Sequence, residues 1–282
     1  MLTEAAGLTD DDLAAIAELE RRVVAHDGGR LKLEWGVLRG RSGQRVDDLL
    51  WRDDGNLLGF LGIYQFGGST PEFAGMVDPT ARRAGIGTEL LTSARRLTRD
   101  RGGQSALIVV PRSTPAGAAF AASQAAALEH SEHHMELVGT PSGRPIHTDV
   151  SVRQATPADT DEIGRILSEA FEEPRDGTPV TLDDSSDEQL VVERGGAIVG
   201  ALRLAREPGV TGIYGLAVDP RLQGQGIGRD VLGRVCHDLR SADPQHQVTL
   251  EVSVSNERAL GLYTSVGFER RTTEDYYQID LR

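Results

Sequence analysis

The chain has 282 residues, 39% of them hydrophobic, and a formal net charge of −13 at pH 7. This length suits two domains better than one core, and the acidic balance argues against a nucleic-acid partner, whose phosphates require a basic face. A single cysteine, Cys236, excludes an internal disulfide framework and a cysteine-based zinc cage. No apolar run approaches the ~20 residues that cross a bilayer, and the acidic residues 1–12 do not resemble a secretory signal. We therefore expect a cytoplasmic protein without a membrane partner.

In the first half, Thr9 and Asp10 are predicted to begin a helix that extends to about Val24, because Thr and Asp are preferred at helix N-termini. A strand before this helix is faint or lost in the pattern. Further along, Arg82-Arg83-Ala84-Gly85-Ile86-Gly87 predicts a glycine-rich turn that leads into a second helix.

Two polar segments lie between the halves of the chain. His130, His133 and His134 cluster in the first, which we interpret as a polar turn entering a strand rather than as a metal site. The second, residues 139–145, is rich in Gly and Pro and predicts a connection between domains.

The second half alternates strands and helices. The expected elements are a strand at 150–154, a helix from Thr156-Pro157 to Phe171, an acidic helical or loop stretch at 172–188, strands at 189–193 and 198–205 joined by a Gly195-Gly196 turn, a strand at 212–218, a helix at 228–240, a strand at 248–254, a helix at 257–266 and a closing strand around 276–281. A glycine turn and a helix between two strands imply one parallel crossover in an otherwise antiparallel sheet. The predicted fold is therefore mixed α/β, of the α+β mixed-sheet type.

The chain also repeats itself at a fixed spacing. Segments that recur 141 positions later are Leu58-Gly59-Phe60-Leu61 at 199–202, Val77-Asp78-Pro79 at 218–220 and the glycine-rich turn at 223–228. A unit of this length is too long for a solenoid repeat and indicates two copies of one domain. We predict domains at residues 1–140 and 150–282, joined by a linker at 141–149.

The glycine-rich turn predicts an anion site. In Gln223-Gly224-Gln225-Gly226-Ile227-Gly228 the glycines allow a tight turn and keep side chains away from a ligand. Successive N–H groups at the start of a helix then attract a group such as a pyrophosphate. The turn alone is also compatible with a strand–helix connection that binds nothing.

A second motif, Asn256-x-x-Ala259-x-x-x-Tyr263-x-x-x-Gly267-Phe268, follows this turn. The two motifs together resemble the GNAT superfamily of acyl-CoA-dependent N-acyltransferases over nearly all of residues 150–282. The resemblance implies two tandem GNAT-like domains and acetyl-CoA as the cofactor.

The resemblance also assigns residues to CoA. Backbone N–H groups of the turn and of the helix start would hold the pyrophosphate, at Gln223, Gly224, Gln225, Gly226, Ile227, Gly228 and Arg229. Strand residues before the turn would pair with the pantetheine arm and polarise the thioester carbonyl, at Leu216, Ala217 and Val218. Asn256 would lie beside the pantetheine arm, and Tyr263 would be the catalytic acid that protonates the departing thiolate.

The acid role of Tyr263 is chemically sound. A phenol with a pKa near 10 remains protonated until a thiolate, whose conjugate acid has a pKa near 8.5, develops beside it. Packing alone would also explain a tyrosine here. The base is harder to assign, because family members often carry a glutamate on the strand before the turn, and residues 212–218 contain no carboxylate. Glu251, Glu172, Glu173 and an ordered water all stay open.

The first copy looks incomplete. The resemblance implies that Val77, Arg82, Arg83, Gly85 and Gly87 still bind a CoA. In its later segment, Ser113 and Phe120 take the places of the Asn and Tyr, and Gln124-Ala125 takes the place of Gly-Phe. Because Phe120 has no hydroxyl to donate, we expect a structural or CoA-binding copy without catalysis.

The expected function is transfer of acetyl from acetyl-CoA to a primary amine of a small molecule, by direct attack in a ternary complex in the C-terminal domain. An acetyl-CoA-binding sensor or partner-binding module without turnover is the alternative. Among tandem members of the superfamily, the layout is similar to the mycothiol synthases, which acetylate the cysteinyl amine of a sugar–inositol conjugate. A metal is not expected, and the sequence does not indicate an oligomeric state.

Overall fold

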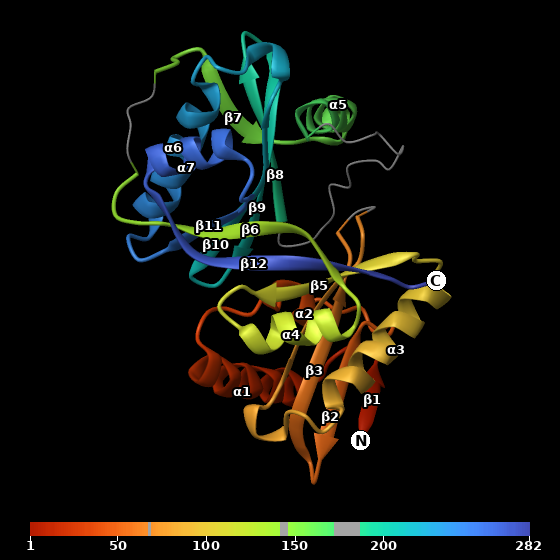
Figure 1. The fold of residues 1–282 in the computed structure, drawn as a ribbon. Helices are drawn as coiled ribbons and strands as arrows, with labels where there is room; N and C mark the ends of the chain where they lie inside the picture. Colours follow the sequence, from red (N-terminus) through yellow and green to blue (C-terminus); the bar gives the residue numbers. More distant parts are fainter. Residues whose placement is uncertain (67–68, 142–145, 172–186) are drawn as a thin grey trace. The chain divides into compact units, whose positions relative to one another are not determined.

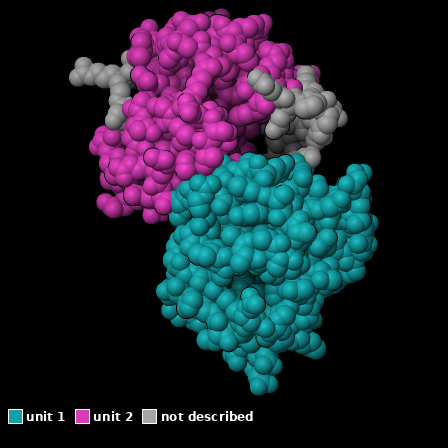
Figure 2. Space-filling view, viewed as in Figure 1, with its two compact units in different colours: residues 1–131, 272–282 teal, residues 132–271 magenta. Residues whose placement is uncertain are grey.

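The computed structural model describes residues 1–66, 69–141, 146–171 and 187–282 (Figure 1). These residues form two compact units, shown in different colours in Figure 2. Unit 1 contains residues 1–131 and 272–282, and unit 2 contains residues 132–271. No described helix is long and apolar enough to span a membrane.

Unit 1 is a twisted sheet with helices on both faces. In chain order its elements are β1 (Leu2–Ala5), α1 (Asp10–Asp27), α2 (Trp35–Arg39), β2 (Asp48–Asp53), β3 (Asn56–Tyr64), β4 (Glu72–Val77), α3 (Ile86–Asp100), β5 (Ser105–Pro111), α4 (Pro115–Ser123) and the start of β6 (Ala127–Leu137). The sheet order is β1-β2-β3-β4-β5-β12, and only the β4–β5 pair is parallel. Thr9 caps α1 in a capping box with Asp12, as the sequence predicts. The expectation that the opening strand is faint or lost is wrong, because β1 pairs with β2.

Unit 2 has the same layout. Its elements are β7 (Val150–Gln154), α5 (Thr160–Phe171), β8 (Asp187–Arg194), β9 (Ala197–Glu207), β10 (Val210–Val218), α6 (Ile227–Ala242), β11 (Gln247–Ser253), α7 (Glu257–Val266) and the start of β12 (Phe268–Asp280). The sheet order is β6-β11-β10-β9-β8-β7, and β10 and β11 are the parallel pair. These elements confirm the predicted order of strands and helices and the mixed α/β class. Residues 172–186 of the predicted acidic stretch lie outside the described residues.

The last strand of each sheet comes from the other half of the chain. In unit 2, residues 132–136 of β6 pair with residues 249–253 of β11. In unit 1, β12 pairs with β5, from Glu274 opposite Pro111 to Asp280 opposite Ser105. Packing therefore divides the chain differently from the sequence repeat, and the boundaries at 140 and 150 stay a prediction about the repeat. His130, His133 and His134 lie within β6 itself, so their interpretation as a polar turn is wrong.

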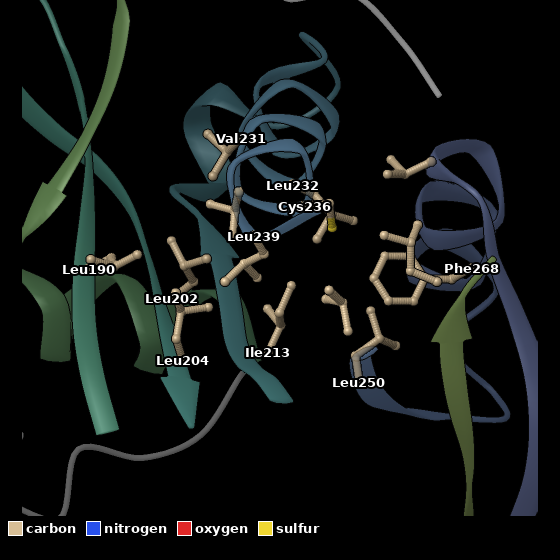
Figure 3. Close-up of a cluster of buried hydrophobic side chains, with 14 of the residues drawn as sticks. Leu190, Leu202, Leu204, Ile213, Val231, Leu232, Cys236, Leu239, Leu250 and Phe268 are labelled. Carbon is tan, nitrogen blue, oxygen red and sulfur yellow. The ribbon is translucent and has the colours of Figure 1, made fainter. Parts of the chain in front are cut away.

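Apolar side chains fill both faces of each sheet. In unit 1, α1 packs on one face through Ile16 and Leu19, and α3 packs on the other through Leu90 and Ala94. In unit 2, α6 and α7 cover one face in the cluster of Figure 3, where Cys236 is fully buried. The smaller cluster around Ile163 of α5 covers the opposite face. Because burial of each large apolar side chain contributes about 1.5–3 kcal/mol, these faces hold the strands that carry the site.

Candidate functional site

The centre of unit 2 is the point at which its two parallel strands separate. The ladder between β10 and β11 runs from Val210 opposite Gln247 to Ile213 opposite Leu250. Beyond this pair β10 continues to Val218, and β11 pairs with β6 through Ser253. A bulge between Tyr214 and Ala217 in the β10–β9 register bends β10 at the same place. The described strands therefore diverge immediately after Ile213.

Because β10 and β11 no longer pair after Ile213, an opening lies between them, and some backbone groups of β10 face it. The N–H of Asp219 donates to the carbonyl of Val199 on β9 at 2.9 Å. Because successive backbone groups of a strand point to opposite edges, those of Val218 and Leu216 point away from β9 and towards the opening. Ala217 is paired with Ala201 of β9, so its backbone faces the other edge.

The glycine-rich turn closes the end of this opening. Gly224 and Gly226 have φ values of +79° and +86°, which favour glycine over other residues. Gly226 is the N-cap of α6, whose first residues are Ile227, Gly228 and Arg229. Left-handed residues before a helix direct successive N–H groups into one concave surface, where an anion also meets the positive end of the helix.

Gln223 braces the turn through its side chain. Its Nε2 donates to the carbonyl of Val218 at 2.9 Å, and its Oε1 accepts from Arg258 Nη1 at 2.6 Å. In unit 1, Nε of Arg82 donates to the carbonyl of Val77 at 3.2 Å in the same way. The first residue of the motif therefore fixes the end of the strand rather than presenting its own side chain to an anion.

A second brace comes from residues that the sequence analysis missed. His147 Nε2 lies 2.9 Å from the carbonyl oxygen of Gln225. Asp230, buried in the first turn of α6, accepts the backbone N–H groups of Ile146 and His147 at 3.0 Å each. Because the C=O and N–H of one trans peptide point in opposite directions, holding the Gln225 carbonyl on this side directs the N–H of Gly226 into the concave surface. Nothing in the pattern of residues 139–149 indicates this contact.

Helix α7 places the predicted acid beside the strand. Asn256 is its N-cap and accepts the N–H of Ala259 at 3.0 Å, so the first residue of this motif serves to start the helix. A Cβ on Gly228 would lie 3.5 Å from Leu262 and 3.6 Å from Val218, which shows how closely α7, α6 and β10 meet. Tyr263 is the next residue along α7.

Tyr263 is positioned as a neutral donor. Its ring packs in the same cluster as Leu216 and Val218, and its centroid lies 6.2 Å from that of Phe268. Burial raises the pKa of the Tyr263 hydroxyl to about 12. Within the described part of the chain, this hydroxyl has no hydrogen-bond partner. A protonated phenol with a free donor is the arrangement that an acid for a leaving thiolate requires.

Of the three glutamates considered as the general base, the structure describes only Glu251. Glu172 and Glu173 lie outside the described residues, and Glu251 lies in β11 opposite His134 of β6. In the described ranges, no group of three or more His, Cys, Asp or Glu side chains could hold a metal ion.

Unit 1 contains an open cleft at the corresponding place. Its β4–β5 ladder covers only Glu72 opposite Leu107 and Phe73 opposite Ile108, and a cavity of about 560 Å³ lies beyond these pairs. The lining includes all five residues that the sequence analysis assigned to CoA in this copy: Val77, Arg82, Arg83, Gly85 and Gly87. Asp27 also lines it, and its carboxylate binds Arg82 Nη2 at 2.6 Å, a contact that lowers the pKa of Asp27. The cleft fits the size range of small-molecule sites.

Unit 1 lacks a hydroxyl where unit 2 has Tyr263. The N-cap of α4 is Thr114, which corresponds to Asn256, and Phe120 contacts Gly87 as Leu262 contacts Gly228. The pairing of Phe120 with Tyr263 is therefore wrong by one residue, and Ala121 occupies the equivalent position. Ala121 is fully buried and offers no proton.

Comparisons with known proteins agree with this architecture. A family model described as the acetyltransferase (GNAT) family matches residues 12–123 and again 160–268. A mycothiol acetyltransferase of Mycolicibacterium smegmatis is 30% identical over 284 residues, covering 93% of this chain and 94% of the relative. A GCN5-related N-acetyltransferase from Sphaerobacter thermophilus matches the fold with a TM-score of 0.81 at 20% identity, over 100% of this chain and 96% of that one. A tandem GNAT protein from the clavulanic acid biosynthesis pathway matches the fold with a TM-score of 0.72 at 18% identity, over 100% of this chain and 98% of that one. The chain therefore belongs to the GNAT family, as a tandem member and an acyl-CoA-dependent N-acetyltransferase.

Proposed function

We propose that unit 2 transfers an acetyl group from acetyl-CoA to the primary amine of a small molecule, by direct attack within a ternary complex. The observation that carries this proposal is Tyr263, a partly buried tyrosine that packs against the same cluster as Leu216 and Val218 of β10 and whose pKa is raised to about 12 by burial. Members of the family use acetyl-CoA in general, and the concave turn at Gly224–Gly226 suits its pyrophosphate.

The role of each residue follows from its position. N–H groups of the turn and of the start of α6 hold the pyrophosphate. The pantetheine arm pairs with the edge of β10 at Leu216 and at the N–H of Val218, since the Val218 carbonyl already accepts from Gln223 Nε2. An N–H on this edge polarises the thioester carbonyl, where negative charge develops during attack. Tyr263 then donates its proton to the departing thiolate.

For unit 1 we propose binding without chemistry. Its cleft keeps the turn and the diverging strands, but Ala121 replaces the acid. A CoA held there would stabilise unit 1 in the manner of any ligand that binds only the folded state. A protein with this unit alone would act as a sensor rather than as an enzyme.

The acceptor that we favour is the cysteinyl amine accepted by mycothiol acetyltransferases. The relative from M. smegmatis aligns with the chain over nearly its whole length, which supports this choice. The strand before the turn, residues 212–218, lacks a glutamate, so the amine proton passes either to a carboxylate on another segment or to an ordered water.

The test is the Tyr263→Phe variant. Removal of the hydroxyl should lower kcat by at least tenfold, within the ~10²–10⁴ range of acid–base catalysis, and should leave the Kd of acetyl-CoA within twofold. Tyr214→Phe, on the same unit but with its ring folded over Gly212, is the matched control and should keep wild-type turnover. Equal turnover of Tyr263→Phe and wild type would refute the acid role.

A further inference from the structure

We propose that His147 is a positioning residue for acetyl-CoA, which holds the glycine-rich turn of unit 2 in its anion-binding form by way of the Gln225 carbonyl. This inference rests on the proposed acetyl transfer and concerns a residue outside the two motifs of the sequence. It begins with residues 146–150, here called the clip, which lead into β7 and contact both the turn and α6.

The clip is anchored to α6 through its backbone. The carboxylate of Asp230 is 1% exposed and accepts the N–H groups of Ile146 and His147 at 3.0 Å each. One turn further along α6, Arg234 binds the same carboxylate at 3.0 Å. Arg234 also donates to the backbone carbonyls of His147 and Val150. The backbone of His147 is therefore fixed on both sides relative to the start of α6.

The imidazole of His147 lies against the back of the turn. Its Nε2 is 2.9 Å from the carbonyl oxygen of Gln225, and a Cβ on Gly226 would lie 3.8 Å from the same nitrogen. Because a carbonyl oxygen only accepts, Nε2 carries the proton of this bond. The side chain of His147 is only 15% exposed, so water competes little for the donor.

The side chain of Gln225 is held from a second direction. Arg194, the last residue of β8, donates Nη1 to Gln225 Oε1 at 3.0 Å and Nε to Asp149 of the clip at 2.8 Å. Asp149 in turn lies 3.9 Å from Nδ1 of His147. Both oxygens of Gln225, in its backbone and in its side chain, are therefore bound by groups that are tied to the clip.

The turn needs such a brace because glycines flank the peptide that must be oriented. Gly224 and Gly226 carry positive φ values, and glycine backbones rotate more freely than those of other residues. If the peptide between Gln225 and Gly226 rotated by half a turn, it would direct a carbonyl rather than an N–H towards an anion. The bond from His147 stabilises the orientation that binds an anion, and a donor fixed in advance reduces the ordering cost of binding.

Unit 1 solves the same problem differently. Arg83 takes the place of Gly224, and a residue with a side chain restricts the backbone without help from a neighbour. A Cβ on Gly85 would meet no atom of the described residues within 4 Å, so none of these residues lies where His147 lies in unit 2. The clip is therefore a feature of the unit that we propose to be catalytic.

The role predicts a change in affinity rather than in chemistry. His147 acts on the cofactor only through the peptide between Gln225 and Gly226. Loss of one neutral hydrogen bond corresponds to about three- to tenfold weaker binding. Because the pyrophosphate is bound equally before and during the reaction, the loss should raise the KM for acetyl-CoA and leave kcat unchanged.

The experiment compares His147→Phe, His147→Gln and His246→Phe in the full chain. Phenylalanine keeps a ring at position 147 and removes the donor, so the KM and the Kd of acetyl-CoA should rise three- to tenfold with kcat within twofold of wild type. Glutamine places an amide N–H near the position of the imidazole Nε2 and should restore affinity to within twofold. His246→Phe is the matched control, because His246 also makes one side-chain bond, to Thr211 at 2.8 Å, and should leave KM and kcat within twofold.

A truncated substrate separates positioning from general damage. S-acetylpantetheine carries the thioester but lacks the pyrophosphate. Its kcat/KM should therefore be the same in His147→Phe and wild type, whereas the kcat/KM of acetyl-CoA falls three- to tenfold. An equal fall with both substrates would show that the variant distorts unit 2 as a whole and would overturn the positioning role.

The remaining outcomes are separable. A wild-type KM and Kd for acetyl-CoA in His147→Phe would overturn the proposal. If His147→Phe does not fold, His147→Ala and His147→Gln decide: weaker binding in the alanine variant alone supports the proposal, and an equal Kd in both overturns it. Absence of amine-dependent turnover in the wild type would contradict the proposed function, whereas the Kd comparison would still decide the role of His147.

Discussion

The two glycine-rich turns allow one substitution to be made in matched form. Gly226 in unit 2 and Gly85 in unit 1 have φ values of +86° and +88°, and each is the N-cap of the following helix. Among the described residues, a Cβ on Gly85 would meet no atom within 4 Å, and one on Gly226 would meet His147 at 3.8 Å and Ile146 at 3.9 Å. Alanine is therefore not excluded by space at either position, and its cost is conformational.

The expected loss of acetyl-CoA affinity in Gly226→Ala follows from a conformational cost and a lost hydrogen bond. A left-handed conformation costs an L-residue about 1–2 kcal/mol. If the turn relaxes to avoid this cost, Gly226→Ala loses at least one N–H bond to a charged phosphate, worth about 1.5–3 kcal/mol. A loss of about 1.4–2.8 kcal/mol corresponds to a 10- to 100-fold weaker affinity. We therefore expect Gly226→Ala to raise the KM for acetyl-CoA 10- to 100-fold.

Gly85→Ala should have the same conformational cost but no effect on turnover. Initial rates of thiol release measure KM and kcat, thermal unfolding compares the stability of the two variants, and calorimetry counts the acetyl-CoA molecules bound. We expect kcat and KM of Gly85→Ala within twofold of wild type, with weaker binding confined to a second site. A larger loss of turnover in Gly85→Ala than in Gly226→Ala would refute the assignment of catalysis to unit 2.

Three further predictions concern stability and reactivity. Ala125→Gly should raise the free energy of unfolding in urea by about 0.5–1 kcal/mol, because Ala125 has a φ of 57° at the position that Gly267 holds in unit 2; a loss of stability would contradict this. Burial raises the pKa of the Cys236 thiol to about 12, so a thiol reagent at pH 8 should label it only in denaturant, and rapid labelling of the native protein would be inconsistent with its burial. The pKa of Tyr263 is raised from 10.0 to about 12, so the stability from its neutral form is fully present below pH 10 and is lost as the pH rises through 12. Tyr263→Phe should remove about 2 kcal/mol of this alkaline loss in urea titrations at pH 8 and pH 11.5, and identical pH dependence in both proteins would count against a raised pKa of Tyr263.

Much of the fold could be predicted from local pattern. The helix predicted at 257–266 matches α7, and Thr9 caps α1, because both rest on cap residues and apolar spacing that act within one turn. The spacing of 141 aligns both glycine turns. Gly85 and Gly226 share a φ above zero, whereas Arg83 has a φ of +67° at the position that Gly224 holds in unit 2. After the turn this spacing no longer holds, and only the N-caps Thr114 and Asn256 show which residue takes the place of Tyr263.

The exchange of the last strands could not be predicted. β6 and β12 follow equivalent helices and alternate in the same way, so each suits the edge of either sheet, and the pairing depends on contacts far apart in sequence. The contact of His147 with the turn is likewise long-range, because it joins residues 78 positions apart. Glu251 was visible in the sequence as a candidate base, but its place opposite His134 required the register of two strands.

The central claim is acetyl transfer to an amine, and thiol release from acetyl-CoA tests it most directly. The acceptor panel contains polyamines, amino acids, aminoglycosides, peptides with free N-termini and the cysteinyl sugar–inositol conjugate. We predict release that depends on an acceptor and is fastest with the cysteinyl conjugate, together with a mass increase of one acetyl group on that amine. Binding of acetyl-CoA without acceptor-dependent release from any member of the panel would contradict the proposed function and favour a binding module.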